Sequence, residues 1–394
     1  MKKEKTNKNS WIYPRMFKAF KEARLGKRKT ANEQKFERHL AINMSKLIEE
    51  VENRTYKPSR GIAFITFDPV IREIFAAPFR DRIIHHFLYD LVYEWWDKHF
   101  IYDSYSCRLG KGSLLGIKRL YHHIMSVSEN GTKEAFVLKL DLQGYFMSLP
   151  RGKLFKQADW GLKKQFLERK FSSKGERIDC EKKYKLCRFL WRKIIFDNPI
   201  EGVTVKGKKS DWEALPKSKS MFHAKKGCGI VIGNLTSQLL SNIYLDLLDR
   251  FVVYELGCKH YGRYVDDFYL VSTSKEQLLD FKVRICNFLI SIAVKLHPKK
   301  QYLQEVSKGV LFLGAVVYPF RIFSGRRLKK GFCRELFHSD DEGEDSNKIN
   351  ASLVSYRGMI KHFKYKKLEE RVRRAKARKC VQQTMQNVSP RIQG

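Results

Sequence analysis

The sequence predicts an α+β fold in which helices surround a central antiparallel sheet. Two observations lead to this prediction. Stretches with apolar residues at helical spacing alternate with short β-rich runs along most of the chain. Two of these runs, 260–264 and 268–272, are separated by only a few residues, which is typical of a hairpin in an antiparallel sheet.

The N-terminal part of this fold is mainly helical. Apolar residues recur at helical spacing over 34–53, and the proline in the Tyr-Lys-Pro sequence at 56–58 ends the pattern. A β-rich run at 62–67, an aromatic-rich helical pattern at 80–100 and a glycine-containing segment at 102–116 follow. We therefore expect a helix, a strand, a longer helix and a loop in this order.

The middle of the chain supplies the centre of the sheet. An apolar strand at 135–140 ends at Asp141. The segment 198–226 contains glycine, proline, serine and many lysines without periodicity, so we expect a long loop or insertion. A strongly periodic helix at 237–256 then leads into the hairpin.

The C-terminal part is expected to return from sheet to helix. The patterns indicate a helix at 276–293, a further strand at 310–318, an acidic exposed loop at 339–346 and a basic helix at 361–379.

The charge of the chain restricts its partners. Its 394 residues include 78 Lys and Arg against 42 Asp and Glu, a formal net charge of +36. This favours an extended polyanion as partner. With 43% hydrophobic residues global disorder is excluded, and no apolar stretch approaches the roughly 20 residues that span a bilayer. No secretory signal is apparent, so we expect a cytoplasmic protein without a membrane span.

Asp266 and Asp267 are candidate metal ligands. Adjacent carboxylates at a hairpin tip repel one another unless a hard cation lies between them. Phosphoryl transfer to a nucleic-acid 3′ end uses two divalent ions about 4 Å apart, bridged by a carboxylate from another strand. Asp141, at the end of an apolar strand, is the natural third ligand. An isolated Asp-Asp pair has the alternative role of a turn or helix cap.

Several motifs resemble those of one enzyme family. Tyr264-Val265-Asp266-Asp267 resembles the (Y/F)-x-D-D motif of reverse transcriptases, and 141–146 resembles their first carboxylate motif. Blocks similar to the loop-helix block at the incoming base pair, the lysine motif, the primer-grip hairpin and two fingers blocks of bacterial and intron-type enzymes occur at 229–238, 296–300, 312–314, 72–82 and 104–112. The resemblance covers roughly 28–365.

The block at 232–238 points to a subgroup. Most relatives carry Gln-Gly at its first two positions and Ser-Pro at its end, whereas this chain has Ile-Gly-Asn-Leu-Thr-Ser-Gln. This form, with Lys111-Gly112 and the segment 212–220, resembles reverse transcriptases of diversity-generating retroelements. Those enzymes copy a template-repeat RNA with frequent errors opposite adenine, and the cDNA diversifies a target gene. Ile232 in place of glutamine removes a hydrogen-bonding contact beside the nascent pair, which would loosen discrimination there.

The resemblance implies a right-hand polymerase with fingers, a palm of antiparallel sheet and helices, and a helical thumb. We expect a basic N-terminal extension at 1–27, fingers at 28–130, a palm at 131–320 with its insertion at about 198–226, and a thumb and basic tail at 321–394.

The same resemblance implies roles for individual residues. Asp141, Asp266 and Asp267 would hold two Mg²⁺ ions, with Mn²⁺ as a possible substitute. Lys300, with Lys299 as the alternative, would protonate or neutralise the leaving pyrophosphate.

Further residues would contact the nucleotide. Arg72 would bind the triphosphate. Phe146 would exclude a ribose 2′-hydroxyl, with Tyr145 as the rival gate and a core position as the alternative role of Phe146. For Arg108 a solvated surface charge is the favoured interpretation. The residues expected against the nascent base pair are Ile232, Gly233 and Gln238.

The implied partners are a template RNA, the cDNA or its primer, dNTPs and a small basic accessory protein that forms a pentamer. Two alternatives stay open. One is a reverse transcriptase of antiphage defence that copies a non-coding RNA. The other is a catalytically silent basic RNA-binding scaffold, against which the presence of all three aspartates argues.

Overall fold

The computed structural model describes residues 11–26, 30–67, 70–337, 346–363, 370 and 372–378. The helices are α1 (Ile12–Arg24), α2 (Ala31–Glu37), α3 (Leu40–Glu52), α4 (Phe79–His99), α5 (Ser113–Val127), α6 (Tyr145–Ser148), α7 (Arg151–Phe166), α8 (Lys174–Phe196), α9 (Lys209–Glu213), α10 (Leu235–Arg250), α11 (Lys275–Ser291), α12 (Arg326–Phe337) and α13 (Ser346–Ile360). The strands are β1 (Ile62–Thr66), β2 (Arg72–Ala76), β3 (Phe136–Leu142), β4 (Thr204–Val205), β5 (Tyr261–Tyr264), β6 (Asp267–Ser272), β7 (Leu296–Glu305), β8 (Val310–Phe312), β9 (Ala315–Tyr318) and β10 (Arg321–Ser324).

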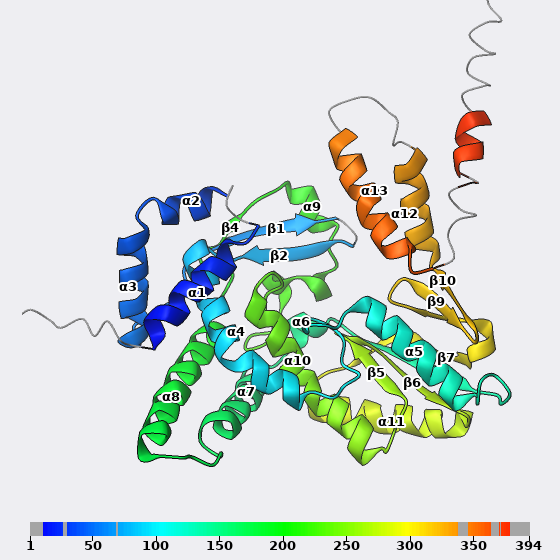
Figure 1. Ribbon diagram of the computed structural model, residues 1–394, viewed down its shortest axis with the longest axis horizontal. Coiled ribbons are helices and arrows are strands. Elements are labelled where there is room, and N and C mark those ends of the chain that lie inside the picture. Colours follow the sequence, from blue (N-terminus) through cyan, green and yellow to red (C-terminus); the bar gives the residue numbers. More distant parts are fainter. Residues whose placement is uncertain are drawn as a thin grey trace, which may run out of the picture.

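A four-stranded antiparallel sheet, in the order β5-β6-β3-β7, lies at the centre of the fold (Figure 1). Side chains alternate between its two faces. Leu138 and Leu140 of β3 face α10 and α11, whereas Val137 faces α5. By the same alternation Lys139 and Asp141 lie on the face of α5. The α+β prediction with a central antiparallel sheet is therefore confirmed.

Two smaller sheets flank the centre. One has the order β2-β1-β4, in which β1 pairs antiparallel with β2 and parallel with β4. The other is the meander β10-β9-β8. The first sheet is tied to the loop before α10 by a hydrogen bond from the backbone N–H of Phe75 to the carbonyl of Ile232, 2.9 Å long. This bond holds β2, which starts with Arg72, beside the loop that precedes α10.

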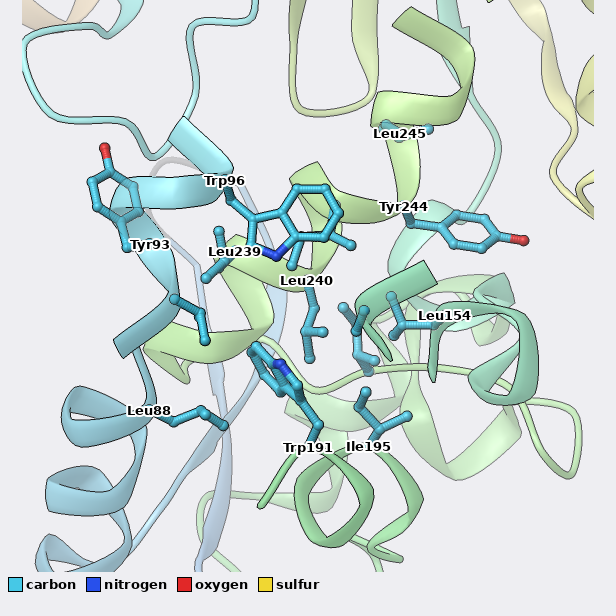
Figure 2. Packing of buried hydrophobic residues seen from close by; sticks show 14 of the residues in the cluster. Leu88, Tyr93, Trp96, Leu154, Trp191, Ile195, Leu239, Leu240, Tyr244 and Leu245 are labelled. Atoms are coloured by element: carbon cyan, nitrogen blue, oxygen red, sulfur yellow. The ribbon is translucent and has the colours of Figure 1, made fainter. Parts of the chain in front are cut away.

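One hydrophobic core joins the helices to the sheet. Figure 2 shows Trp96 of α4, Trp191 of α8 and Leu239 of α10 packed together. The approach is close, because a Cβ added at Gly161 of α7 would lie 2.1 Å from the ring of Trp96. Met16 of α1 is buried in the same cluster. The expected boundaries at 27 and 130 therefore do not separate hydrophobic cores.

Several expected elements differ from those observed. The helix expected at 34–53 is interrupted between α2 and α3, and the strand expected at 310–318 is the hairpin β8–β9. The segment 198–226 is not a continuous loop, since it contains β4, α9 and two short 3-10 turns, η1 (Lys217–Lys219) and η2 (Met221–His223). The helix expected at 237–256 starts earlier and ends in the π-helical turn η3 (Phe251–Glu255).

The C-terminal expectations are tested only in part. Instead of one helix over 361–379, α13 ends at Ile360 and a separate helical stretch covers 372–378. Nearly all of the expected acidic loop, 339–345, lies outside the described residues. In the part of the chain that the structure describes, no helix is long and apolar enough to cross a membrane.

Candidate active site

Three carboxylates meet at one end of the central sheet. Asp141 of β3 and Asp267 of β6 are direct cross-strand partners. Asp266 lies in the turn between β5 and β6, and its carbonyl accepts a 3.1 Å hydrogen bond from the N–H of Leu142. Partners on adjacent strands have Cβ atoms roughly 5 Å apart. The pairing therefore places side chains that are far apart in sequence at one sheet edge.

Burial and mutual repulsion shift the acidity of this group. Burial, followed by the charge of Asp141, raises the pKa of Asp266. Burial raises the pKa of Asp267 to about 6, although the ammonium group of Lys139 opposes the shift. One carboxylate oxygen of Asp267, Oδ1, is buried and has no hydrogen-bond partner among the described residues. This end of the sheet therefore concentrates negative charge that its surroundings only partly neutralise.

Two lysines lie against the carboxylates. The Nζ of Lys300 is 3.0 Å from Asp141 Oδ2. The register of β3 and β7 shifts between Leu140 and Leu142, so several residues of β7 lie opposite Asp141. Such a bulge changes the direction of side chains, here those of the β7 segment that includes Lys300. Lys299 makes no ion pair with the described residues, which favours Lys300 over its neighbour. Sequence analysis missed Lys139, whose Nζ lies 3.1 Å from Asp267 Oδ2.

The turn that carries Asp266 has an unusual backbone. Val265 has a φ of 55°, a conformation that β-branched residues rarely adopt. Both of its backbone polar groups are held. Its N–H donates to Oγ of Ser106 over 3.1 Å, and its carbonyl accepts from Nη1 of Arg263 over 3.0 Å. Residues held in strained conformations persist when the surrounding structure over-determines them.

A buried ion pair supports this turn from behind. The guanidinium of Arg263 donates to both carboxylate oxygens of Asp249, at 2.7 and 2.6 Å, and both side chains are fully buried. Arg263 also donates to Oγ of Ser104 and to Oδ1 of Asn242. Sequence analysis missed this network. The available signal was the charged residue at position 263, which alternation places on the same face as the buried Tyr261.

The two candidate gate residues differ in environment. The hydroxyl of Tyr145 is buried and donates a 2.7 Å hydrogen bond to the carbonyl of Ser241, so this ring is part of the core. Phe146 is only partly buried and packs, like Ile232, against the small cluster around Phe75 and Met147. Of the two, Phe146 is therefore the one placed beside the loop expected at the nascent base pair.

The remaining expected nucleotide contacts surround this end of the sheet. Arg72 is exposed, and its charge lowers the pKa of Asp266 although burial outweighs it. Gly233 has a φ of +126°, and a Cβ there would lie 2.7 Å from the carbonyl oxygen of Phe75. Gln238 is exposed in the first turns of α10. The fold thus brings the expected residues of β2, the loop before α10 and the β5–β6 turn together.

Arg108 is not the solvated surface charge that we expected. Its side chain is buried, and its guanidinium donates to Asp97 Oδ1 at 2.6 Å and to the carbonyls of Ile101 and Ser104. A long side chain beside a loop can satisfy several backbone carbonyls at once. Arg108 therefore fixes the loop before α5, and with it Ser104.

The chemistry of the site fits a hard cation. Carboxylate oxygens are the ligands that Mg²⁺ prefers, and one buried oxygen of Asp267 has no hydrogen-bond partner among the described residues. Among the described residues, however, no three His, Cys, Asp or Glu side chains are gathered closely enough to hold a metal ion as they stand. The ammonium groups of Lys139 and Lys300 contact two of the carboxylates instead. Cations in this position must therefore compete with the two lysines.

Comparisons with known proteins assign neither a family nor an activity to this chain. No family model matches the chain, and no curated protein matches it. Among solved structures, telomerase from Candida tropicalis in complex with a TWJ fragment of telomeric RNA matches with a TM-score of 0.47 and 12% identity, over 77% of this chain and 53% of that one. The corresponding telomerase complex from Candida albicans matches with a TM-score of 0.44 and 13% identity, over 84% and 58%. This chain thus spans little more than half of either neighbour, and a likeness this weak assigns no activity.

Proposed function

We propose that this chain is an RNA-directed DNA polymerase of the reverse-transcriptase type. The observation that carries the proposal is the position of Asp141 opposite Asp267 across β3 and β6, with Asp266 in the adjoining turn. Two-metal nucleotidyl transfer uses carboxylates that together hold two divalent ions, and this arrangement gathers three carboxylates at one end of the sheet. The ordered sequence motifs that resemble reverse transcriptases support RNA as template and DNA as product.

The three aspartates would hold two Mg²⁺ ions, or Mn²⁺, which when bound activate the primer 3′-hydroxyl and stabilise the charge on the leaving pyrophosphate. Lys300, whose Nζ lies 3.0 Å from Asp141 Oδ2, would neutralise or protonate that pyrophosphate. Arg72 is exposed at the start of β2 and can bind phosphate oxygens with two parallel N–H groups. Phe146 would exclude a ribose 2′-hydroxyl.

Primer extension on an RNA template with Mg²⁺ and dNTPs tests the proposal. The double variant Asp266→Ala plus Asp267→Ala is expected to lose at least about 10³-fold in activity, because stabilisation of the charge that develops in the transition state provides most of the acceleration in such reactions. Glu276→Ala plus Asp280→Ala, two exposed carboxylates of α11, serves as the control and should retain activity. Equal extension by wild type and the first variant would contradict the catalytic assignment. An inactive wild type that binds RNA would favour the scaffold alternative.

We further propose that the enzyme is error-prone at template adenines and serves to diversify a target gene. Support comes from Ile232, which packs among apolar side chains and would offer no hydrogen-bonding group to the nascent pair that the resemblance implies there. Ile232→Gln is expected to lower misincorporation opposite template adenine, measured by sequencing of the cDNA. Ile232→Leu keeps the site apolar and should retain the error spectrum. An unchanged spectrum in Ile232→Gln would argue against this role of Ile232.

The genomic context separates this role from antiphage defence. A template and variable repeat pair beside the gene, with a small gene for a basic accessory protein, is expected for diversification. A defence enzyme would lack the repeat pair. Sequencing the RNA that co-purifies with the protein would show which RNA serves as template.

A further inference from the structure

A cleft on the opposite side of the helical body from α12 and α13 has an unusual composition. It lies between the C-terminal end of α8 and the segment before β1, and it encloses about 380 Å³. Figure 1 shows α8 far from α12 and α13. The lining residues are Lys57, Pro58, Arg60, Arg192, Lys193, Phe196 and Asp197.

The charge balance of this cleft favours an anion. Its single carboxylate, Asp197, is already paired with Arg60 at 3.4 Å. Lys57, Arg192 and Lys193 have no acidic partner among the described residues. The C-terminal end of α8 contributes an opposing partial charge of about half an electron. Three unpaired positive charges outweigh it.

The basic surface continues from the cleft along α8. Lys182, Lys185, Phe189, Arg192 and Phe196 follow one another at intervals of three and four residues, which places them on one face of the helix. This face extends over roughly 20 Å. Its three basic residues and Phe196 are exposed, and Phe189 is partly exposed. Phe189 packs partly against the hydrophobic core, whereas Phe196 is exposed among the basic residues of this face.

Phe196 distinguishes a nucleic acid from a free anion. Phe196 is 47% exposed next to Arg192 and Lys193, and its ring centroid lies 5.5 Å from that of Phe155. Grooves that bind single-stranded nucleic acids combine positive charge that follows the backbone with aromatic rings on which unpaired bases stack. Bases in a duplex are already stacked and cannot use such a ring. The arrangement is therefore suited to a single strand.

We propose that the exposed face of α8 (Lys182, Lys185, Phe189, Arg192 and Phe196), with Lys57 and Lys193, binds a single-stranded nucleic-acid segment outside the candidate active site. That this segment is RNA rests on the proposed function, in which a template RNA is bound. The surface would hold a part of that RNA that is not being copied. None of the residues involved belongs to the proposed catalytic or nucleotide-binding groups.

Binding of a labelled short single-stranded RNA to the full chain, measured by fluorescence anisotropy over a range of salt concentrations, tests the proposal. The triple variant Lys57→Gln, Arg192→Gln and Lys193→Gln is expected to bind at least about tenfold more weakly, with a salt slope smaller by up to about 2, since each phosphate contact on a single strand contributes about 0.7. The control Lys275→Gln, Lys282→Gln and Arg284→Gln removes the same charge from α11 and should bind as wild type. Equal weakening in both triple variants would overturn the proposal.

Phe196→Ala provides an independent test. It should weaken single-strand binding roughly tenfold, because a base loses its stacking partner, while the salt slope stays unchanged. Binding of duplex RNA should be unaffected. Unaltered single-strand binding in Phe196→Ala would overturn the proposal. Extension of a short annealed primer and template, run in parallel, should be unchanged in all variants, so that failure of the polymerase assignment is recognised separately.

Discussion

Two segments that meet at the candidate active site are held in opposite ways. The turn with Val265 and Asp266 is supported by a buried polar network centred on Arg263 and Asp249. The loop with Ile232 and Gly233 is held by backbone hydrogen bonds to β2 and to the carbonyl of Phe146, and by apolar contacts, with no buried ion pair of its own among the described residues. Removing one member of a buried charge network leaves its partners unpaired and destabilises the fold. Apolar contacts, in contrast, accept many side chains of suitable volume.

In the proposed function, this difference assigns catalysis to the turn with Asp266 and base selection to the loop with Ile232. In the proposed polymerase the polar network would fix the carboxylates that hold metal, and a change there would affect every nucleotide equally. The side chain at position 232 can vary without disturbing that network, because only its backbone carbonyl is used in the hydrogen bond to Phe75. An enzyme of this design could change its fidelity while keeping its catalytic groups.

The largest expected effect comes from breaking the buried ion pair. Asp249→Leu leaves the guanidinium of Arg263 buried without its carboxylate, which should cost about 3–5 kcal/mol of unfolding free energy. Adding Arg263→Met removes the uncompensated charge and should restore most of the stability. Denaturant unfolding followed by tryptophan fluorescence measures both effects.

The same pair of variants tests whether the network positions the turn. The restored double variant still lacks the donor to the carbonyl of Val265, so its primer extension should remain about 10–100-fold below wild type. Wild-type activity in the stable double variant would show that the ion pair serves stability alone.

A smaller effect is expected on the other side of the comparison. Gly233→Ala forces a Cβ to 2.7 Å from the carbonyl of Phe75 at a φ of +126°, which should cost about 2–3 kcal/mol and displace the loop from β2. Gly112→Ala, with a similar φ of +133° but no atom within 4 Å, isolates the cost of the backbone conformation and should destabilise by about 1–2 kcal/mol. Equal costs would mean that the close approach to β2 is unimportant.

The contrast also explains what the sequence could predict. Asp141 and Asp267 follow or begin apolar strands, so local patterns located both. Asp249 and Arg263 lie on different elements, and their pairing depends on how α10 packs against β5, which no local pattern contains. Lys139 was missed for a similar reason, since its partner belongs to the neighbouring strand.

Two further differences have the same origin. The strand β7 is rich in lysine and glutamine and has no apolar alternation, so its pairing with β3 decides its conformation. The sequence gives no reason to prefer Tyr145 or Phe146 as the gate. The structure distinguishes them, because the hydroxyl of Tyr145 donates a hydrogen bond to the carbonyl of Ser241 on α10. Whether the three aspartates bind metal stays a prediction.

A further prediction concerns the free energy of unfolding that is lost when the carboxylate of Asp267 is buried in its charged form. The pKa of Asp267 is about 6 in the folded protein and about 3.9 in the unfolded chain, so between these values the folded state binds the extra proton. In Mg²⁺-free buffer the contribution of Asp267 to stability therefore falls as pH rises from about 4 to about 6. Asp267→Asn should be more stable than wild type by about 1–2 kcal/mol at pH 7 and lose that advantage near pH 4.

The control for this prediction is Asp280→Asn, an exposed carboxylate of α11 that should show no such pH dependence. Thermal unfolding in chelator at several pH values gives the comparison. A pH-independent difference between Asp267→Asn and wild type would show that burial of the charge is not the cause.

The smallest expected effect comes from one hydroxyl group. Ser106→Ala leaves the N–H of Val265 without its acceptor, which should cost about 1 kcal/mol in stability and allow the turn with Asp266 to shift. If the hydroxyl positions the carboxylates, the Mg²⁺ concentration for half-maximal extension should rise severalfold, and Ser106→Thr, which keeps a hydroxyl, should restore it. Ser128→Ala is the matched control, because that buried hydroxyl donates to the carbonyl of Ile124 far from the turn. A similar loss of stability without any change in Mg²⁺ requirement would show that Ser106 contributes to stability alone. The conformation of Val265 would then not depend on the hydrogen bond to Ser106.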